Sequence, residues 1–184
     1  MAAYGWITRK FIRYGEVITE HLAASSVTSA KLASGAVGSA AIAAGGVASS
    51  NIDENVMQYA TVTIPSAAIL TSNATPVTLV PGQAGKTITF VGATLMLDYG
   101  GVQYATNGTI NIIEETSATV LSTDVANTFL FSNADKVSTC KAIATDVTLT
   151  PGKGIQFFVK TGNPTAGTSV LRVKVAYRVH ATGF

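Results

Sequence analysis

Large aliphatic residues recur at every fifth position between residues 17 and 56. The positions are Val17, Leu22, Val27, Leu32, Val37, Ile42, Val47 and Ile52. Residues five apart lie about 140° apart around an α-helix, and an odd spacing also fails to place them on one face of a strand. A chain that turns once per unit would gather them on one side, and residues 28–32 can form such a turn.

This repeat cannot be stable as an isolated chain. One aliphatic residue in five buries too little surface to offset about 1–2 kcal/mol of backbone entropy per ordered residue. Disorder, a short solenoid and several identical chains wrapped together are the three alternatives. The low charge of the segment disfavours disorder, and 40 residues give only about two solenoid coils. We therefore predict that residues 17–57 form a shaft in which the eight aliphatic positions are the shared core of several chains.

The segment before the repeat, residues 1–16, has a different composition. It contains the only tryptophan of the chain and a group of basic and aromatic side chains, namely Trp6, Arg9, Lys10, Phe11 and Arg13. Such residues often anchor interfaces, and the segment is too short to bury them by itself. We interpret it as a peptide that docks on another protein. The alternatives are that it folds back on its own shaft or lies on a membrane surface.

Residues 58–184 are expected to form a mainly β domain. Alternating apolar and polar residues between Gly- and Pro-containing turns predict about ten strands and no helix. The expected strands are 58–64, 75–80, 86–98, 108–115, 118–122, 127–131, 136–143, 146–150, 154–161 and 169–181. This number of strands indicates an antiparallel β-sandwich of the jelly-roll kind.

The last expected strand carries a stripe of basic residues. Leu171, Val173, Val175, Tyr177 and Val179 share one face of this strand, and the opposite face carries Arg172, Lys174, Arg178 and His180. The pattern is typical of a strand with one buried and one solvated face. The basic stripe needs no function beyond solvation, although it could also meet an acidic partner.

The sequence contains no recognisable catalytic or metal-binding pattern. The two histidines, His21 and His180, are far apart, and Cys140 lies in an alternating pattern that predicts a small buried residue. Glu114 and Glu115 are adjacent, so in a strand they would point to opposite faces. We expect no enzyme activity, no cofactor and no metal.

Two classes of partner are also excluded by the sequence pattern. The formal net charge is only +2 and the longest basic run is Arg9-Lys10, which does not predict nucleic-acid binding. The chain has no run of 18 apolar residues and therefore no expected membrane insertion.

The repeat resembles known repeats of bacteriophage proteins. The units in Ser26-Val-Thr-Ser-Ala-Lys-Leu-Ala-Ser-Gly-Ala-Val37 are similar to the Val-Thr-Ser-Ala-Lys-Ile-Ala-Asp-Gly-Ala-Val repeats of tailed-bacteriophage fibre and appendage proteins. Residues 62–65, 85–90 and 97–101 resemble segments in β-sandwich domains of phage virion proteins. Later repeat units depart from the pattern at Gly38, Ala41, Ala43 and Ala44, which makes these units more hydrophobic.

The resemblance implies a homotrimeric structural protein on the virion surface. Trp6, Arg9, Lys10, Phe11 and Arg13 would dock on the capsid, the repeat would join three chains, and the β-sandwich would face outward. A 40-residue shaft spans at most about 130 Å, which suits a head fibre or capsid decoration protein. The alternatives are a short tail fibre or spike tip that binds a host receptor or surface glycan through loop aromatics such as Tyr99 and Tyr104, and a glycan hydrolase with facing carboxylates.

Overall fold

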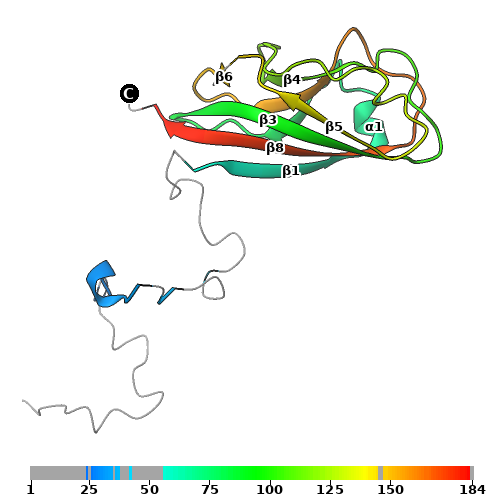
Figure 1. The fold of residues 1–184 in the computed structure, drawn as a ribbon. Helices are drawn as coiled ribbons and strands as arrows, with labels where there is room; N and C mark the ends of the chain where they lie inside the picture. Colours follow the sequence, from blue (N-terminus) through cyan, green and yellow to red (C-terminus); the bar gives the residue numbers. More distant parts are fainter. Residues whose placement is uncertain are drawn as a thin grey trace, which may run out of the picture. The chain divides into compact units, whose positions relative to one another are not determined.

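The computed structural model describes residues 24, 26–34, 36, 37, 42, 56–144 and 147–182. The chain divides into two units, Met1–Ala48 and Ser49–Phe184. Eight strands and a one-turn helix are described in the second unit, and a short 3-10 helix in the first (Figure 1).

The described residues of the repeat include two turns that are five residues apart. The 3-10 helix Ser29–Lys31 is closed by a bond from the Lys31 N–H to the Thr28 carbonyl. Five residues later, the Ala36 N–H donates to the Ala33 carbonyl at 3.0 Å. The helical turn expected within residues 28–32 is therefore present, and its hydrogen-bond pattern recurs with the period of the aliphatic residues.

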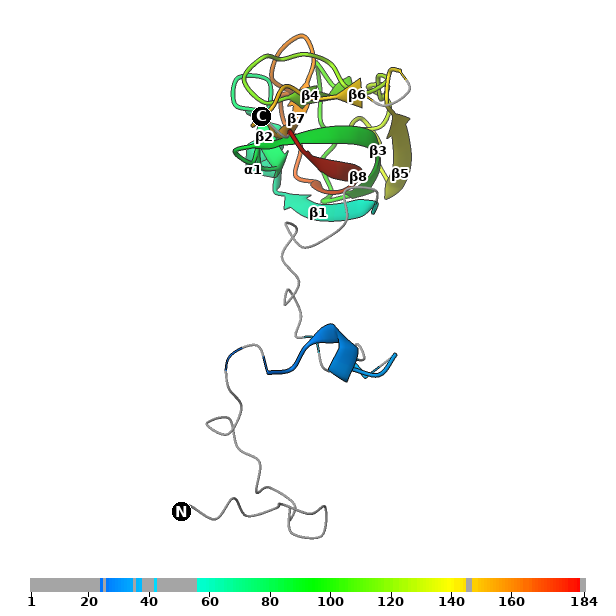
Figure 2. The same cartoon turned by 90° about the vertical axis from the view of Figure 1, so that its left-hand side faces the viewer.

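The second unit is an antiparallel β-sandwich, as the sequence predicts. The larger sheet contains β1 (Gln58–Ile64), β8 (Val170–Ala181), β3 (Lys86–Asp98) and β5 (Lys136–Lys141), with β6 (Val147–Thr148) also on β3. The smaller sheet contains β2 (Val77–Val80), β7 (Ile155–Val159) and β4 (Ile110–Glu114). Figure 2 shows the two sheets as facing layers.

The strand pairs are nested, which identifies the topology. β1 pairs with β8, β2 with β7, and β3 with β5 and β6. Residues 119–125 complete the series, because their backbone exchanges hydrogen bonds with β4, including Leu121 N–H to Ile112 O at 2.8 Å. One long antiparallel hairpin folded across itself gives this nesting, which is a jelly roll.

The core lies between the two sheets and follows from strand alternation. Leu171, Val173 and Val175 of β8 are fully buried, whereas the intervening Arg172 and Lys174 are exposed, as the sequence predicts. Ile155, Phe157 and Val159 of β7 face them from the smaller sheet and belong to the same cluster. Cys140 is also buried in this core and is a free thiol, and burial raises its pKa.

Parts of the predicted secondary structure of this domain are wrong. The helix α1 (Ser66–Ile69) interrupts a domain that was expected to contain none. Residues 127–131 form turns rather than a strand, closed by local bonds such as Phe131 N–H to Asn127 O. Phe129 and Leu130 are adjacent yet both buried, and a strand would direct only one of them inward.

Candidate functional site

The residues predicted for capsid docking lie outside the described part of the chain, as do four of the eight shaft positions. The docking residues are Trp6, Arg9, Lys10, Phe11 and Arg13, and the shaft positions are Val17, Leu22, Val47 and Ile52. The other four shaft residues, Val27, Leu32, Val37 and Ile42, are 54, 45, 52 and 43% exposed. All four therefore present apolar surface in a single chain.

The outer face of the large sheet is the most regular surface of the β-sandwich. Strand registers place three rows of side chains across it: Thr63, Arg172, Met96 and Val137; Thr61, Lys174, Thr94 and Thr139; and Tyr59, Ala176, Gly92 and Lys141. A fourth row consists of Arg178, Thr89 and Thr148, and His180 stands beside Thr87 next to it. Threonine hydroxyls, small residues and cations thus dominate the face.

Three hollows follow one another along this face in the direction of β3 and β8. The Arg172 hollow is lined by residues that include Thr63, Met96, Asp98, Asp135, Val137 and Arg172. The Lys174 hollow is lined by Tyr59, Gly92, Thr94, Thr139, Lys174, Ala176 and their neighbours. The Arg178 hollow is lined by Thr87, Thr89, Thr148, Arg178 and His180. Their volumes are about 390, 310 and 330 Å³.

The central hollow combines an exposed aromatic ring with a floor of small residues. Tyr59 is 61% exposed, and the Lys174 ammonium lies 4.8 Å from the centre of its ring. Gly92 stands directly opposite Ala176 in the strand register, so no large side chain fills the space between them. A β-carbon at Gly92 would lie 3.0 Å from the Cys140 carbonyl oxygen, a tight contact that a larger residue could make only if the neighbouring backbone moved slightly.

The Arg178 hollow contains a connected group of polar side chains. The Thr89 hydroxyl lies 3.1 Å from both Thr148 Oγ1 and His180 Nε2. The Arg178 Nε is buried and has no hydrogen-bond partner. A buried guanidinium nitrogen without an acceptor is uncommon in proteins, because each buried donor usually finds a partner.

Several polar residues that attracted attention in the sequence support loops instead. Burial alone would raise the pKa of Glu114, but hydrogen bonds from Ser117 and Thr150 and the charge of Lys153 hold this pKa below its usual value. Glu115 accepts the Gly154 N–H at 3.0 Å. The two carboxylates therefore fix the segment 150–154 against the end of β4.

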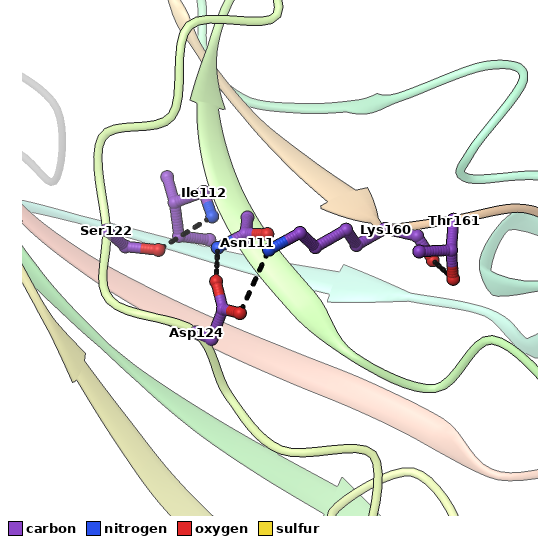
Figure 3. Close-up of polar contacts among 6 residues, drawn as sticks. All are labelled: Asn111, Ile112, Ser122, Asp124, Lys160 and Thr161. Atoms are coloured by element: carbon purple, nitrogen blue, oxygen red, sulfur yellow. Dashed lines mark hydrogen bonds and ion pairs between the residues drawn. The ribbon is translucent and has the colours of Figure 1, made fainter.

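A second polar cluster fastens residues 119–125 to the smaller sheet (Figure 3). Asp124 accepts hydrogen bonds from Asn111 Nδ2 at 2.7 Å and from the Lys160 ammonium at 3.0 Å. These two bonds, the Asn111 bond foremost, lower the pKa of Asp124. Ser122 Oγ accepts the Ile112 N–H at 2.9 Å. The cluster joins three segments and is structural.

Tyr104 is a correction to the sequence analysis. The receptor-binding alternative named Tyr104 as a loop aromatic at the surface, but the residue is only 1% exposed, and its hydroxyl donates to the Ser169 carbonyl at 2.5 Å. Burial raises the pKa of Tyr104 to about 12. Tyr99 is half-buried, and its hydroxyl donates to the Gly101 carbonyl. Neither tyrosine therefore forms an exposed aromatic platform.

The sequence analysis missed Tyr59 and the small residues beside it. Tyr59 alternates with Thr61 and Thr63, so its outward direction could have been read from β1 alone. Its proximity to Gly92 and Ala176 depends on strand order, which no local pattern contains.

The part of the chain that the structure describes shows neither a metal-ligand cluster nor a membrane-spanning helix. These residues contain no cluster of three or more His, Cys, Asp or Glu side chains that could hold a metal ion. None of the described helices is long and apolar enough to cross a membrane.

Comparisons with known proteins give one weak structural similarity. The sequence matches no known protein family and none of the curated proteins. A solved structure, the capsid of Ralstonia phage GP4, aligns with 67% of this chain and 83% of its own chain, at 13% identity and a TM-score of 0.33. A TM-score this low establishes neither a shared fold nor a shared function.

Proposed function

We propose that this chain is a structural, non-catalytic protein of a tailed-bacteriophage virion. In this proposal it is a homotrimeric head fibre or capsid decoration protein on the virion surface. Residues 1–16 dock on the capsid, the repeat joins the three chains, and the β-sandwich faces outward. The motif in residues 26–37, with its resemblance to phage appendage repeats, supports the viral assignment.

The observation that carries the proposal is the exposed aliphatic series of the repeat. Val27, Leu32, Val37 and Ile42 each leave about half of their surface accessible in a single chain. Burying the remainder of each side chain against other copies contributes about 1 kcal/mol per residue. The recurring turn hydrogen bonds, five residues apart, support a chain conformation that repeats with these side chains.

The mass of the full chain in solution tests the oligomer. Light scattering should give about three times the 18.9 kDa of one chain. Leu32→Asp should lower this mass, because a carboxylate would be buried among apolar side chains. Ser34→Asp adds the same charge two residues away, outside the aliphatic series, and should remain trimeric. A Leu32→Asp protein that stays trimeric and equally heat-stable contradicts the shared core.

Virion incorporation tests the docking segment. A chain that lacks residues 1–16 should still form trimers but should be absent from purified particles. Replacing the cluster at Trp6, Arg9 and Phe11 with alanine should have the same effect. Normal incorporation of either variant would rule out the N-terminal anchor.

A second candidate function is a short tail fibre or spike tip that recognises a host receptor or surface glycan. Tyr59, exposed over the central hollow, favours this candidate because exposed aromatic residues often mark recognition surfaces. Antibody labelling of particles in electron micrographs distinguishes the two, because a tail location requires label at the tail and a head fibre requires label over the capsid.

A further inference from the structure

We propose that the outer face of the large sheet binds an anionic oligosaccharide along β8, with its charged groups at Lys174 and Arg178 and a sugar ring against Tyr59. We infer the binding residues and the class of ligand from the geometry of this face. The interpretation of that ligand as a host-surface polymer rests on the proposed virion role.

The cations of β8 are distributed along the row of hollows, one in each. Arg172, Lys174 and Arg178 occupy the same side of the strand, at positions i, i+2 and i+6. At about 3.3 Å per residue, the spacing is about 7 Å between the first two and about 13 Å between the last two. This extended row of positive charge fits an elongated ligand better than a compact one.

Among the described residues, none of these three cations forms an ion pair with a carboxylate. The ion pair found there joins Lys160 to Asp124 beside the smaller sheet, and the Lys174 ammonium lies over the Tyr59 ring. The Arg178 Nε is buried without an acceptor in a hollow that also holds His180 and the Thr89 hydroxyl. A sulfate or carboxylate group in this hollow would lie beside the positive charge of the Arg178 guanidinium.

The central hollow provides contacts for the neutral parts of a sugar. Thr94 and Thr139 lie side by side across β3 and β5, and hydroxyl groups can both donate and accept hydrogen bonds. The gap above Gly92 and Ala176 lies next to the exposed Tyr59 ring. An aromatic ring packs well against the apolar face of a sugar ring while its hydroxyl stays in water.

The charge pattern disfavours a second copy of this chain as the partner of the face, and it also indicates where the anionic groups of the ligand lie. If two copies packed with these faces together, the cations of both copies would gather in one interface, and like charges repel. The Arg172 hollow contains Asp98 and Asp135 beside Arg172 and Lys136, so its charges balance and it is suited to an uncharged part of the ligand. The anionic groups therefore belong at the Lys174 and Arg178 hollows.

Binding of a heparin-derived oligosaccharide to the full chain, measured by titration calorimetry at several salt concentrations, tests the proposal. Lys174→Gln and Arg178→Gln should each weaken binding about tenfold and reduce its salt dependence. Arg178→Lys retains the charge and should weaken binding less than Arg178→Gln. Lys160→Gln, on the smaller sheet, removes the same charge and should change the affinity less than twofold.

Tyr59→Ala separates the sugar contact from the charge contacts. It should weaken binding several-fold while the salt dependence stays unchanged, and Tyr59→Phe should restore most of the affinity. Neutral maltodextrin should bind far more weakly than the sulfated probe. Polyglutamate, which has charge without sugar rings, should be insensitive to Tyr59→Ala.

Three outcomes would overturn the proposal. The first is no measurable binding to the sulfated oligosaccharide. The second is a loss of affinity in Lys160→Gln equal to that in Lys174→Gln and Arg178→Gln. The third is polyglutamate binding that is as tight as binding of the oligosaccharide and as sensitive to Tyr59→Ala. The last result would indicate an acidic polypeptide as the partner of this face. None of these results affects the trimer mass or virion incorporation, which test the proposed virion role separately.

Discussion

Two glycines in similar backbone conformations have very different surroundings. Gly167 and Gly101 have φ angles of +96° and +97°. A β-carbon at Gly167 would lie 2.2 Å from the Tyr104 ring, whereas nothing lies within 4 Å of one at Gly101. Alanine substitutions at these two glycines can therefore distinguish the cost of backbone strain from the cost of steric overlap.

We expect Gly101→Ala to destabilise the protein by about 1 kcal/mol, since only the left-handed backbone disfavours alanine there. Gly167→Ala should cost a further 1–3 kcal/mol, roughly, because the Tyr104 ring must move within a packed interior. Urea unfolding of the two variants measures the difference. Equal losses would mean that the ring relaxes freely.

The buried Tyr104 hydroxyl leads to a second prediction, which concerns the stability of the protein at alkaline pH. Its pKa is about 12 in the folded protein and near 10 when exposed, so the unfolded chain loses its proton first as the pH rises. The free energy of unfolding is therefore unaffected by this group below pH 10 and should fall by about 1 kcal/mol near pH 11. Tyr104→Phe should weaken this decline. Part of it should persist, because burial also raises the pKa of Tyr177.

At the scale of elements, residues 119–125 take the place of a strand through side chains as well as backbone. The Ile112 N–H bonds to the Ser122 hydroxyl rather than to a backbone carbonyl, which interrupts the ladder beside β4. Asp124 then fastens the segment to Asn111 of β4 and to Lys160 after β7.

We expect Asp124→Ala to destabilise the protein by about 1–3 kcal/mol, because it leaves the Asn111 amide, which is 1% exposed, without its acceptor. Lys160→Met should cost less than about 1 kcal/mol, because it removes only a half-exposed ion pair. Thermal unfolding near neutral pH compares them. Equal effects would indicate that the ion pair, and not the buried amide, fastens the segment.

Strands with clear alternation could be predicted from the sequence, and irregular segments could not. Residues 58–64 and 86–98 match β1 and β3 because apolar and polar residues alternate between turn residues. Residues 127–131 failed because Phe129 and Leu130 fill the core from a turn. Tyr104 was misassigned because its partner, the Ser169 carbonyl, is distant in sequence. The outer-face site shares this difficulty, since strand order brings Tyr59, Gly92 and Ala176 together.

At the scale of the whole molecule, the two units obtain their stability from different sources. The β-sandwich has its own core between two sheets, and its nested strand pairs join residues far apart in the sequence. The hydrogen bonds found among the described repeat residues are local, and their aliphatic side chains are exposed. In the proposed trimer, the repeat is therefore stable only when copies associate, whereas the β-sandwich is stable as a single chain.

This difference predicts two unfolding transitions in the full chain. The transition of the repeat should move to higher temperature as protein concentration rises, because association stabilises only the assembled state. The transition of the β-sandwich should not depend on concentration. Leu32→Asp should lower the temperature of the first transition or remove it, and should leave the second in place. Val173→Ala should lower the free energy of unfolding of the β-sandwich by about 2–4 kcal/mol, because it leaves a cavity in the core. Calorimetry over a hundredfold range of concentration measures both. A single transition that moves with concentration would mean that the sandwich itself depends on association, and the contacts between copies would then have to be sought on its sheets.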